Sequence, residues 1–147
     1  MTTIAYRDGV LAADRLMTGG GARCAEVCKV ARSKYGHLAA AAGNASGIAS
    51  LHSWVVAGCD GELPRYEKGT MDGLVIYPTG RVFYWDGSPA LIEMFGPFFA
   101  AGSGQEFAFG AMAVGADARR AVEIAIQFDT LSGGRIDVRR LPRKAAK

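Results

Sequence analysis

The strand-like segments of this chain come in pairs separated by short turns, and no other feature constrains the fold as strongly. Each turn is a tripeptide that ends in glycine, and each flanking run has the length and apolar content of a strand. The turns are Arg7-Asp8-Gly9, Lys34-Tyr35-Gly36 and Pro78-Thr79-Gly80, and the paired runs are 3–6 with 10–13, 27–33 with 37–42, and 74–77 with 82–85. Because strands joined by tight turns run antiparallel, the sequence predicts antiparallel sheets.

A first helix is predicted after the second pair of strands. Asn44 is a typical N-cap for a helix that runs to about residue 57, where Gly58 would end it. Its apolar residues predict a wide buried face rather than a narrow stripe, and they are Ala45, Ile48, Ala49, Leu51, Val55 and Val56. Residues 59–71 mix Gly and Pro with polar side chains and are predicted to be irregular.

Two further helices are predicted near the C-terminus. Ser103 and Glu106 have the spacing of a capping box, so a helix is expected from this point to about Val114. A second helix is expected to begin at Asp117, because apolar residues then recur at helical spacing as far as Phe128. Strands are predicted at 98–101 and 135–141, and Gly19-Gly20-Gly21 is predicted to form a loop.

Antiparallel sheets and two separate groups of helices favour an α+β architecture in one domain, residues 1–147. Two stacked sheets between helix layers, a four-layer αββα sandwich, would let both groups of helices bury an apolar face. The 20 glycines and 25 alanines indicate close approach of layers or of subunits. No apolar run reaches the roughly 18–20 residues of a membrane span, and Met1-Thr2-Thr3 lacks the pattern of a secretory signal.

The positive charge of the chain is concentrated at its C-terminus. The formal net charge is +3, and the last nine residues hold five basic groups and no acidic group. Basic tails can bind nucleic acid, but the tail at 142–147 is interpreted as a solvated chain end. We expect neither a nucleic-acid partner nor a membrane partner.

The cysteines do not indicate a disulfide framework or a metal site. Three cysteines cannot all pair within one chain. Cys24 and Cys28 are close enough in sequence to suggest a metal, but neither His37 nor His52 completes a zinc-type spacing. We therefore expect reduced thiols, a cytoplasmic location, and no metal or other cofactor.

The familiar motifs of nucleophilic catalysis and nucleotide binding are missing from the sequence, which leaves the N-terminus as the candidate site. There is no G-x-S-x-G elbow, no P-loop, and no G-x-G-x-x-G after a predicted strand. Removal of Met1 would give Thr2 a free α-amine beside its own hydroxyl. Since an α-amine titrates near roughly 7.7–8.0, this one residue would contain both a nucleophile and a base.

Six short blocks in a fixed order resemble the proteasome β-type and HslV-like threonine peptidases, a family of N-terminal nucleophile hydrolases. The blocks are Thr2-Thr3-Ile4-Ala5, residues 9–15, Lys29-Val30, Ala42-Gly43, Gly102-Ser103-Gly104, and residues 129–134. Together they cover nearly the whole chain. The start at Met1-Thr2 is most similar to the bacterial HslV branch and its short homologues, whereas the last block is closer to proteasome β subunits.

This resemblance implies a role for each matching residue around the nucleophile. Thr2 would attack the scissile carbonyl through its Oγ, and its own amine would take the hydroxyl proton. Lys29 would depress the pKa of that amine, and Asp14 would hold Lys29 in place and keep it charged. The backbone N–H of Gly43 would donate to the oxyanion.

The remaining implied residues orient the amine or bind the substrate. Ser103, Asp129 and Ser132 would orient the amine by hydrogen bonds. The positions that match the family's pocket beside Thr2 are Met17, Thr18, Ala41 and Ala45, and the small side chain at Ala41 suggests room for a bulky or apolar residue. Thr18 and Gly43 would pair with an extended peptide through backbone hydrogen bonds.

Each of these residues also has a plainer interpretation. Lys29 and Asp14 could form a surface ion pair, Ser103 could be only a helix cap, and residues 129–134 could be only a helix end and a turn. The resemblance implies a homo-oligomeric ring or stacked rings that hydrolyse peptides or unfolded proteins. Two alternatives are a non-catalytic assembly subunit and an N-terminal nucleophile amidase for a small substrate.

The chain departs from the family between Cys59 and Met71, where a typical subunit has the second helix of its first helix pair. That pair faces the partner ring, such as an ATP-dependent unfoldase. The irregular segment predicted here would remove part of this docking surface without changing the residues around Thr2.

Overall fold

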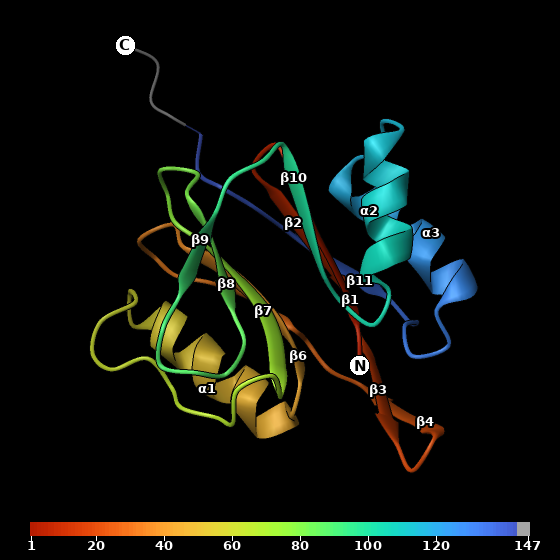
Figure 1. Ribbon diagram of the computed structural model, residues 1–147, viewed down its shortest axis with the longest axis horizontal. Coiled ribbons are helices and arrows are strands. Elements are labelled where there is room, and N and C mark those ends of the chain that lie inside the picture. The colour runs from red at the N-terminus through yellow and green to blue at the C-terminus, as the bar shows by residue number, and fades with distance from the viewer. Residues whose placement is uncertain (144–147) are drawn as a thin grey trace.

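Three antiparallel sheets and three helices make up the α+β fold of the computed structural model, which describes residues 1–143 (Figure 1). The strands are β1 (Thr3–Arg7), β2 (Val10–Asp14), β3 (Leu16–Gly19), β4 (Ala22–Glu26), β5 (Val30–Arg32), β6 (Leu38–Gly43), β7 (Met71–Ile76), β8 (Val82–Trp85), β9 (Ile92–Met94), β10 (Phe98–Gly102) and β11 (Ile136–Arg140). The helices are α1 (Ala45–Val56), α2 (Gln105–Ala113) and α3 (Ala118–Phe128).

The three predicted hairpins are confirmed, and they belong to two different sheets. The four-stranded sheet has the order β10-β1-β2-β11, and the five-stranded sheet has the order β5-β6-β7-β8-β9. The hairpins are β1–β2, β5–β6 and β7–β8. The predicted fold class, α+β with antiparallel sheets, is therefore correct.

The sequence analysis missed a fourth hairpin and one edge strand. The predicted loop at Gly19-Gly20-Gly21 is the turn between β3 and β4, with φ of +55° at Gly20 and +81° at Gly21. All five residues of β4 are exposed, so the strand has no buried face and no apolar alternation. β9 is three residues long and also lacks a buried residue. Exposed strands of this kind carry little periodic signal.

Three buried clusters lie between successive elements. Ile4 and Leu11 of the four-stranded sheet meet Leu38 and Leu74 of the five-stranded sheet. The other face of the four-stranded sheet packs against α2 and α3, and the other face of the five-stranded sheet packs against α1. Figure 1 shows the same sequence of elements, from α1 at the lower left to α3 at the right. Both groups of helices thus cover a sheet face.

Helix α1 begins and ends where the sequence predicts, but its buried face is narrower. The Asn44 side chain accepts hydrogen bonds from the backbone of Ser46 and Gly47, and Gly58 has a φ of +90°. The buried residues are Gly47, Ile48, Leu51 and Val55, whereas Ala45, Ala49 and Val56 are exposed. A Cβ at Gly47 would lie 2.5 Å from Met71 Sδ, so the helix lies closest to the sheet at this glycine. The prediction of a wide buried face is wrong, because contact is confined to the stripe around Gly47.

Helix α3 is capped as predicted, but α2 is not. The Asp117 carboxylate accepts the backbone N–H of Arg120 at 2.8 Å. The N-cap of α2 is Gly104, which has no side chain, and Ser103 does not cap the helix. The Ser103 hydroxyl instead donates to Asp129 Oδ2 at 2.6 Å. The predicted capping box is therefore wrong, because the Ser103 hydroxyl is hydrogen-bonded to Asp129, which is distant in sequence.

The segment between α1 and β7 contains no helix in residues 57–70, as the sequence predicts. Tyr66 and Gly69 donate backbone hydrogen bonds to Gly87 and Asp86, which attach the segment to the turn after β8. The Tyr66 hydroxyl also lies 2.9 Å from the Ser50 hydroxyl on α1.

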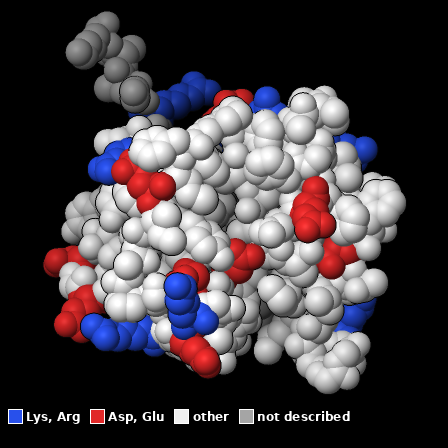
Figure 2. All heavy atoms as spheres, viewed as in Figure 1, with Lys and Arg blue, Asp and Glu red and all other residues white. Residues whose placement is uncertain are grey.

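Charged side chains lie mainly near the rim of the face in Figure 2, with both signs interspersed. Within residues 1–143, no helix is long and apolar enough to span a membrane. Four residues of the predicted basic tail, 144–147, lie outside the described residues.

Two glycines give a test of the close packing at the end of β10. Gly102 has a φ of +92°, and a Cβ there would lie 1.9 Å from the Thr2 carbonyl oxygen. A Cβ at Gly110 in α2 would meet nothing within 4 Å. We expect Gly102→Ala to lower the free energy of unfolding by about 3 kcal/mol or more, measured by urea denaturation. Gly110→Ala should raise it by about 0.5–1 kcal/mol. Equal effects of the two substitutions would contradict this account.

Candidate active site

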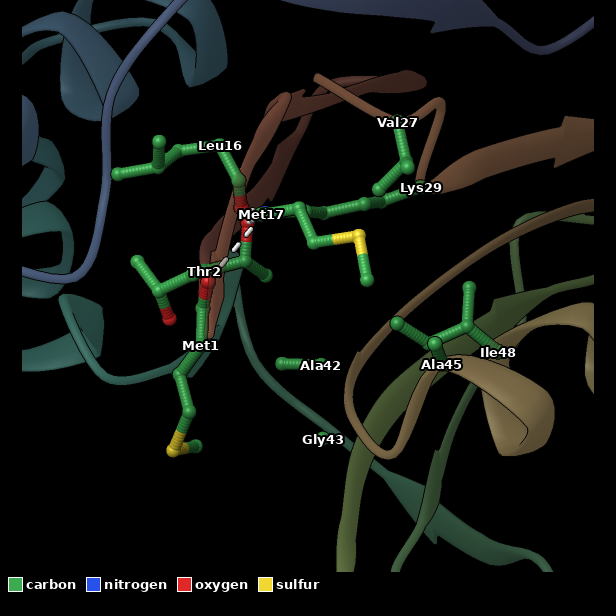
Figure 3. Close-up of a pocket in the computed structure, with 11 residues that line it drawn as sticks. Met1, Thr2, Leu16, Met17, Val27, Lys29, Ala42, Gly43, Ala45 and Ile48 are labelled. Atoms are coloured by element: carbon green, nitrogen blue, oxygen red, sulfur yellow. Dashed lines mark hydrogen bonds between the residues drawn. The ribbon is translucent and has the colours of Figure 1, made fainter. Parts of the chain in front are cut away.

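Thr2 lies at the start of β1 and is completely buried, with Met1 still attached. Lys29 Nζ donates a hydrogen bond to Thr2 Oγ1 at 2.5 Å. The Thr2 hydroxyl in turn donates to Asp14 Oδ1. The hydroxyl therefore lies between a cation and a carboxylate. Figure 3 shows Lys29 reaching Thr2 beside the pocket.

Asp14 and Lys29 form a buried ion pair rather than a surface one. Lys29 Nζ lies 3.4 Å from Asp14 Oδ2, and the two side chains are 3% and 0% exposed. Lys29 Nζ also donates to the Leu16 carbonyl at 2.6 Å. The Asp14 carboxylate accepts backbone N–H groups of Thr3, Leu16 and Gly133 at 2.8, 3.2 and 2.9 Å. The interpretation of this pair as a solvated surface contact is wrong.

Burial lowers the pKa of the Lys29 ammonium, and the neighbouring Asp14 carboxylate opposes this shift. A lysine with a lowered pKa releases its proton more readily than an ordinary one. At the same time, its charge faces the oxygen of Thr2, where negative charge would develop if the hydroxyl lost its proton. The Lys29 ammonium can therefore stabilise an alkoxide at Thr2 Oγ1.

Ser103, Asp129 and Ser132 lie together on the other side of Thr2. Asp129 Oδ2 accepts hydrogen bonds from both serine hydroxyls. The Ser103 hydroxyl also lies 3.3 Å from the Thr2 carbonyl oxygen, and Ser132 Oγ lies 2.7 Å from Thr3 Oγ1. The two serines therefore contact the Thr2 backbone and the Thr3 side chain, and Asp129 holds both serines, so Asp129 to Ser132 is more than a helix end.

The Asp129 carboxylate is affected by the positive charge of the N-terminal ammonium group. Burial raises its pKa, but the hydrogen bonds from Ser103 and Ser132 outweigh this effect, and the pKa is lowered overall. The N-terminal ammonium contributes to the same lowering. Asp129 is thus an anion close to the chain's amino group.

A pocket of about 180 Å³ opens beside Thr2 and Lys29. Gly43 lines it at the end of β6 with a φ of +120°, and a Cβ there would lie 2.5 Å from the Thr70 carbonyl oxygen. This position therefore requires glycine. Among the pocket residues expected from the resemblance, Met17, Thr18 and Ala45 line it.

Ala41 does not line the pocket, which corrects the expectation. It is completely buried beneath α1, in the cluster with Leu51 and Trp85. Successive side chains of a strand point to opposite faces, so the next residue, Ala42, lines the pocket in its place.

The sequence analysis also missed four further lining residues. Leu16, Val27 and Ile48 give the pocket apolar walls, and Met1 lies at its edge (Figure 3). Ile48 could have been found, because it follows Ala45 by one helical turn and shares its face. No pattern in the sequence indicates Leu16 or Val27.

Asp72 connects the two large sheets next to this site. Its carboxylate accepts the backbone N–H of Gly102 at 2.6 Å, which joins β7 to the end of β10. Burial and the Asp72 charge raise the pKa of the neighbouring Tyr84 to about 12. Gly102 directly precedes Ser103, so Asp72 holds the segment that contacts Thr2. No motif in the sequence indicates this residue.

Within residues 1–143, no three His, Cys, Asp or Glu side chains are grouped so that they could hold a metal ion. The cluster around Thr2 contains acids, hydroxyls and one amine. Side chains of these kinds can serve proton transfer and nucleophilic attack.

Solved structures share this fold over nearly the full length of the chain. Thiobacillus denitrificans BPH matches with a TM-score of 0.68 and 22% sequence identity, over 97% of this chain and 99% of that chain. Thiobacillus denitrificans BPH in complex with epoxomicin matches with a TM-score of 0.64 and 24% identity, over the same shares of both chains. No protein-family model matches the chain, and no curated protein is detectably similar in sequence. The fold is thus proteasome-like, as the sequence resemblance implies.

The hydrogen bonds of the buried ion pair predict unequal effects of removing its two members. We expect Asp14→Ala to cost about 3–5 kcal/mol of unfolding free energy, because it leaves a buried cation and three backbone N–H groups without their acceptor. Lys29→Met should cost less, because the Asp14 carboxylate keeps those three donors. Urea denaturation of both variants tests this order, and a larger loss in Lys29→Met would contradict it.

A matched control removes a charge from an exposed ion pair. Arg119 and Glu123 lie on the outer face of α3, with side chains 58% and 37% exposed. Glu123→Gln should change the free energy of unfolding by less than about 1 kcal/mol.

Proposed function

We propose that the protein is a threonine peptidase of the N-terminal nucleophile class, active once Met1 has been removed. The observation that carries this proposal is the 2.5 Å hydrogen bond from Lys29 to Thr2 Oγ1, with Asp14 buried behind both groups. The Lys29 ammonium stabilises negative charge on that oxygen, and the Asp14 carboxylate favours the charged form of Lys29.

In the proposed acylation step, Thr2 Oγ1 attacks the carbonyl carbon of the scissile peptide bond. The Thr2 α-amine, free after processing, takes the hydroxyl proton directly or through water. The tetrahedral oxyanion accepts the backbone N–H of Gly43, a contact worth roughly 3–4 kcal/mol in comparable sites. The amine then returns the proton to the leaving nitrogen, and an ester on Thr2 remains.

In the second step, water hydrolyses the ester with the same amine as the base. The charged form of Lys29, which the neighbouring Asp14 carboxylate favours, keeps the pKa of the amine low enough for it to act as a base. Ser103, Asp129 and Ser132 hold the amine in position, which the contact of Ser103 with the Thr2 carbonyl supports. In this proposal Asp72 has a positioning role, because it fixes the backbone just before Ser103.

The structural neighbour supports the same chemistry. Thiobacillus denitrificans BPH was solved with bound epoxomicin, and the two chains match over nearly their full lengths. We extend the proposal to the four-layer αββα fold of N-terminal nucleophile hydrolases and to the short HslV-like branch of the family. The order of the buried clusters, from α1 through both sheets to α2 and α3, supports this assignment.

We further propose a self-assembled ring or a stack of rings. Phe107 and Phe128 lie on the outer surface of α2 and α3, are 43% and 62% exposed, and have ring centroids 5.6 Å apart. Exposed aromatic pairs of this kind are typical of protein interfaces. Residues 57–70 form no helix, so the helix pair on which an unfoldase would dock is incomplete. Such an unfoldase is therefore a poor candidate partner.

The identity of the first residue tests the nucleophile. Protein purified from its source should lack Met1 by intact-mass measurement and should cleave fluorogenic peptides. Thr2→Ala should abolish cleavage, because it removes the attacking oxygen, whereas Thr2→Ser should retain part of it. A peptide epoxyketone should attach to Thr2 in stoichiometric amounts.

Thr79→Ala is the matched control, because Thr79 is exposed in the turn between β7 and β8. Its activity should equal that of the unsubstituted protein. Retention of Met1 in active material would contradict the mechanism. A folded, ring-forming protein that keeps Met1 and cleaves nothing would favour the non-catalytic assembly subunit, and turnover of small amides only would favour the amidase.

The pocket beside Thr2 predicts a preference for apolar side chains before the scissile bond. Its walls are apolar at Met17, Val27 and Ile48, and its volume is about 180 Å³. We expect Ala45→Leu to narrow the pocket and to shift the preference in kcat/KM from large toward small residues by about tenfold. Ala49→Leu, one turn along the same helix on an exposed position, should leave the preference unchanged.

A further inference from the structure

A second hollow lies at the far end of the four-stranded sheet from Thr2. Thr2 precedes β1, whereas this hollow is at the turn between β1 and β2, where Arg7 pairs with Val10. The start of α3, the end of β11 and Arg32 of β5 complete its walls. Its volume is about 510 Å³, nearly three times that of the pocket beside Thr2. We refer to it as the basic groove.

The charge of the basic groove is strongly positive. Its walls include five guanidinium groups and two carboxylates, namely Arg7, Arg32, Arg119, Arg139, Arg140, Asp8 and Asp117. The difference of three charges equals the formal net charge of the whole chain, +3. The groove thus carries a local excess of three positive charges, and the basic residues Arg143, Lys144 and Lys147 follow β11 in the sequence.

Two of the five arginines have structural partners. Arg7 donates to the carbonyls of Met112 and Ala116 at 2.6 and 3.2 Å and lies over the ring of Phe98, so it holds the loop between α2 and α3. Arg119 pairs with Glu123 at 3.3 Å.

The other three arginines are available to a ligand. Arg32, Arg139 and Arg140 form no ion pair within residues 1–143, and Arg139 donates one hydrogen bond, to the Val138 carbonyl at 3.0 Å. Cations that gather without counter-charges repel one another, and an anionic ligand removes this repulsion. The guanidinium group also matches a planar carboxylate with two parallel hydrogen bonds.

The basic lining continues into a second hollow beside the basic groove. A smaller hollow of about 360 Å³ shares Asp8, Val10 and Arg140 with it and adds Arg143. The basic walls thus continue from the start of α3 past the end of β11. β11 is at the edge of its sheet, where an extended chain can lie alongside a strand.

The lining distinguishes between classes of polyanion. The basic groove has no aromatic side chain on which a nucleic-acid base could stack. Asp8 and Asp117 would repel a continuous phosphate backbone, but they leave room for carboxylates placed at intervals. Val10 and Val138 offer apolar contacts between the charged groups, as a peptide ligand requires.

We propose that the basic groove binds an extended, carboxylate-rich peptide segment of a partner protein, with its acidic side chains on Arg32, Arg139 and Arg140. This site is separate from the proposed peptidase centre and does not depend on it. Thr2 and its ion pair contribute no residue to the groove.

Fluorescence anisotropy with the full-length protein tests the proposal. The probes are a labelled oligoglutamate peptide and an oligoglutamine peptide of equal length, at low and at high ionic strength. We expect the glutamate peptide alone to bind, and its affinity to fall with added salt. The triple substitution Arg32→Gln, Arg139→Gln and Arg140→Gln should weaken binding by at least about tenfold.

A charge-matched control removes three cations elsewhere, through Arg23→Gln, Arg65→Gln and Lys68→Gln. It should bind as tightly as the unsubstituted protein, and circular dichroism should show that both triple variants are folded. Equal binding of the two peptides, or equal weakening in the two variants, would overturn the proposal. Tighter binding of inorganic polyphosphate or of oligothymidylate than of the glutamate peptide would overturn it in favour of phosphate recognition.

Discussion

The buried ion pair of Asp14 and Lys29 is the interaction on which the rest of the site depends. Placing two charges in the interior is unfavourable unless their remaining hydrogen-bonding capacity is met. Here the acceptors and donors come from the start of β1, the beginning of β3 and the loop after α3, through Thr3, Leu16 and Gly133. The pair therefore determines where these segments meet, and Thr2 lies at that junction. The buried charges thus assemble the site, and they also require these three segments to meet in one arrangement.

Local chemistry made much of the fold predictable. Asp8-Gly9, Asn44 and Asp117 act through neighbours in sequence, and the hairpin and the two helix starts lie where those residues indicate. The prediction that Ser103 caps a helix failed because its hydrogen-bond partner, Asp129, is 26 residues away in the sequence. In the site, the resemblance to the family correctly grouped Thr2, Asp14 and Lys29. It placed Ala41 in the pocket, but side chains alternate along a strand, and Ala42 lines the pocket instead. The role of Asp72 could not be predicted, because a hydrogen bond between two sheets produces no pattern in the sequence of either strand.

The many small residues have a definite place in this arrangement. Residues 39–42 of β6 are four successive alanines, all buried, in a strand that is covered on both faces. The larger side chains Leu38, Leu51 and Trp85 fill the space on either side. At Gly43, Gly102 and Gly104, a Cβ would collide with backbone or with Thr3. Small residues thus bring the start of β1 beside Thr2, the edge of the pocket and the start of α2 into direct contact.

Most hydrogen bonds around Thr2 are already formed while Met1 is present, and only the one from Lys29 to the Met1 carbonyl would be lost with Met1. Lys29 bonds to the Thr2 oxygen, Asp14 holds Lys29, and Ser103 contacts the Thr2 carbonyl before any bond to Met1 is broken. Under the proposed function, maturation is then a covalent event without a conformational one. A newly made chain would fold into an inert form whose nucleophile is shielded from water, and the time at which it becomes competent would be set by a single hydrolysis at its first peptide bond.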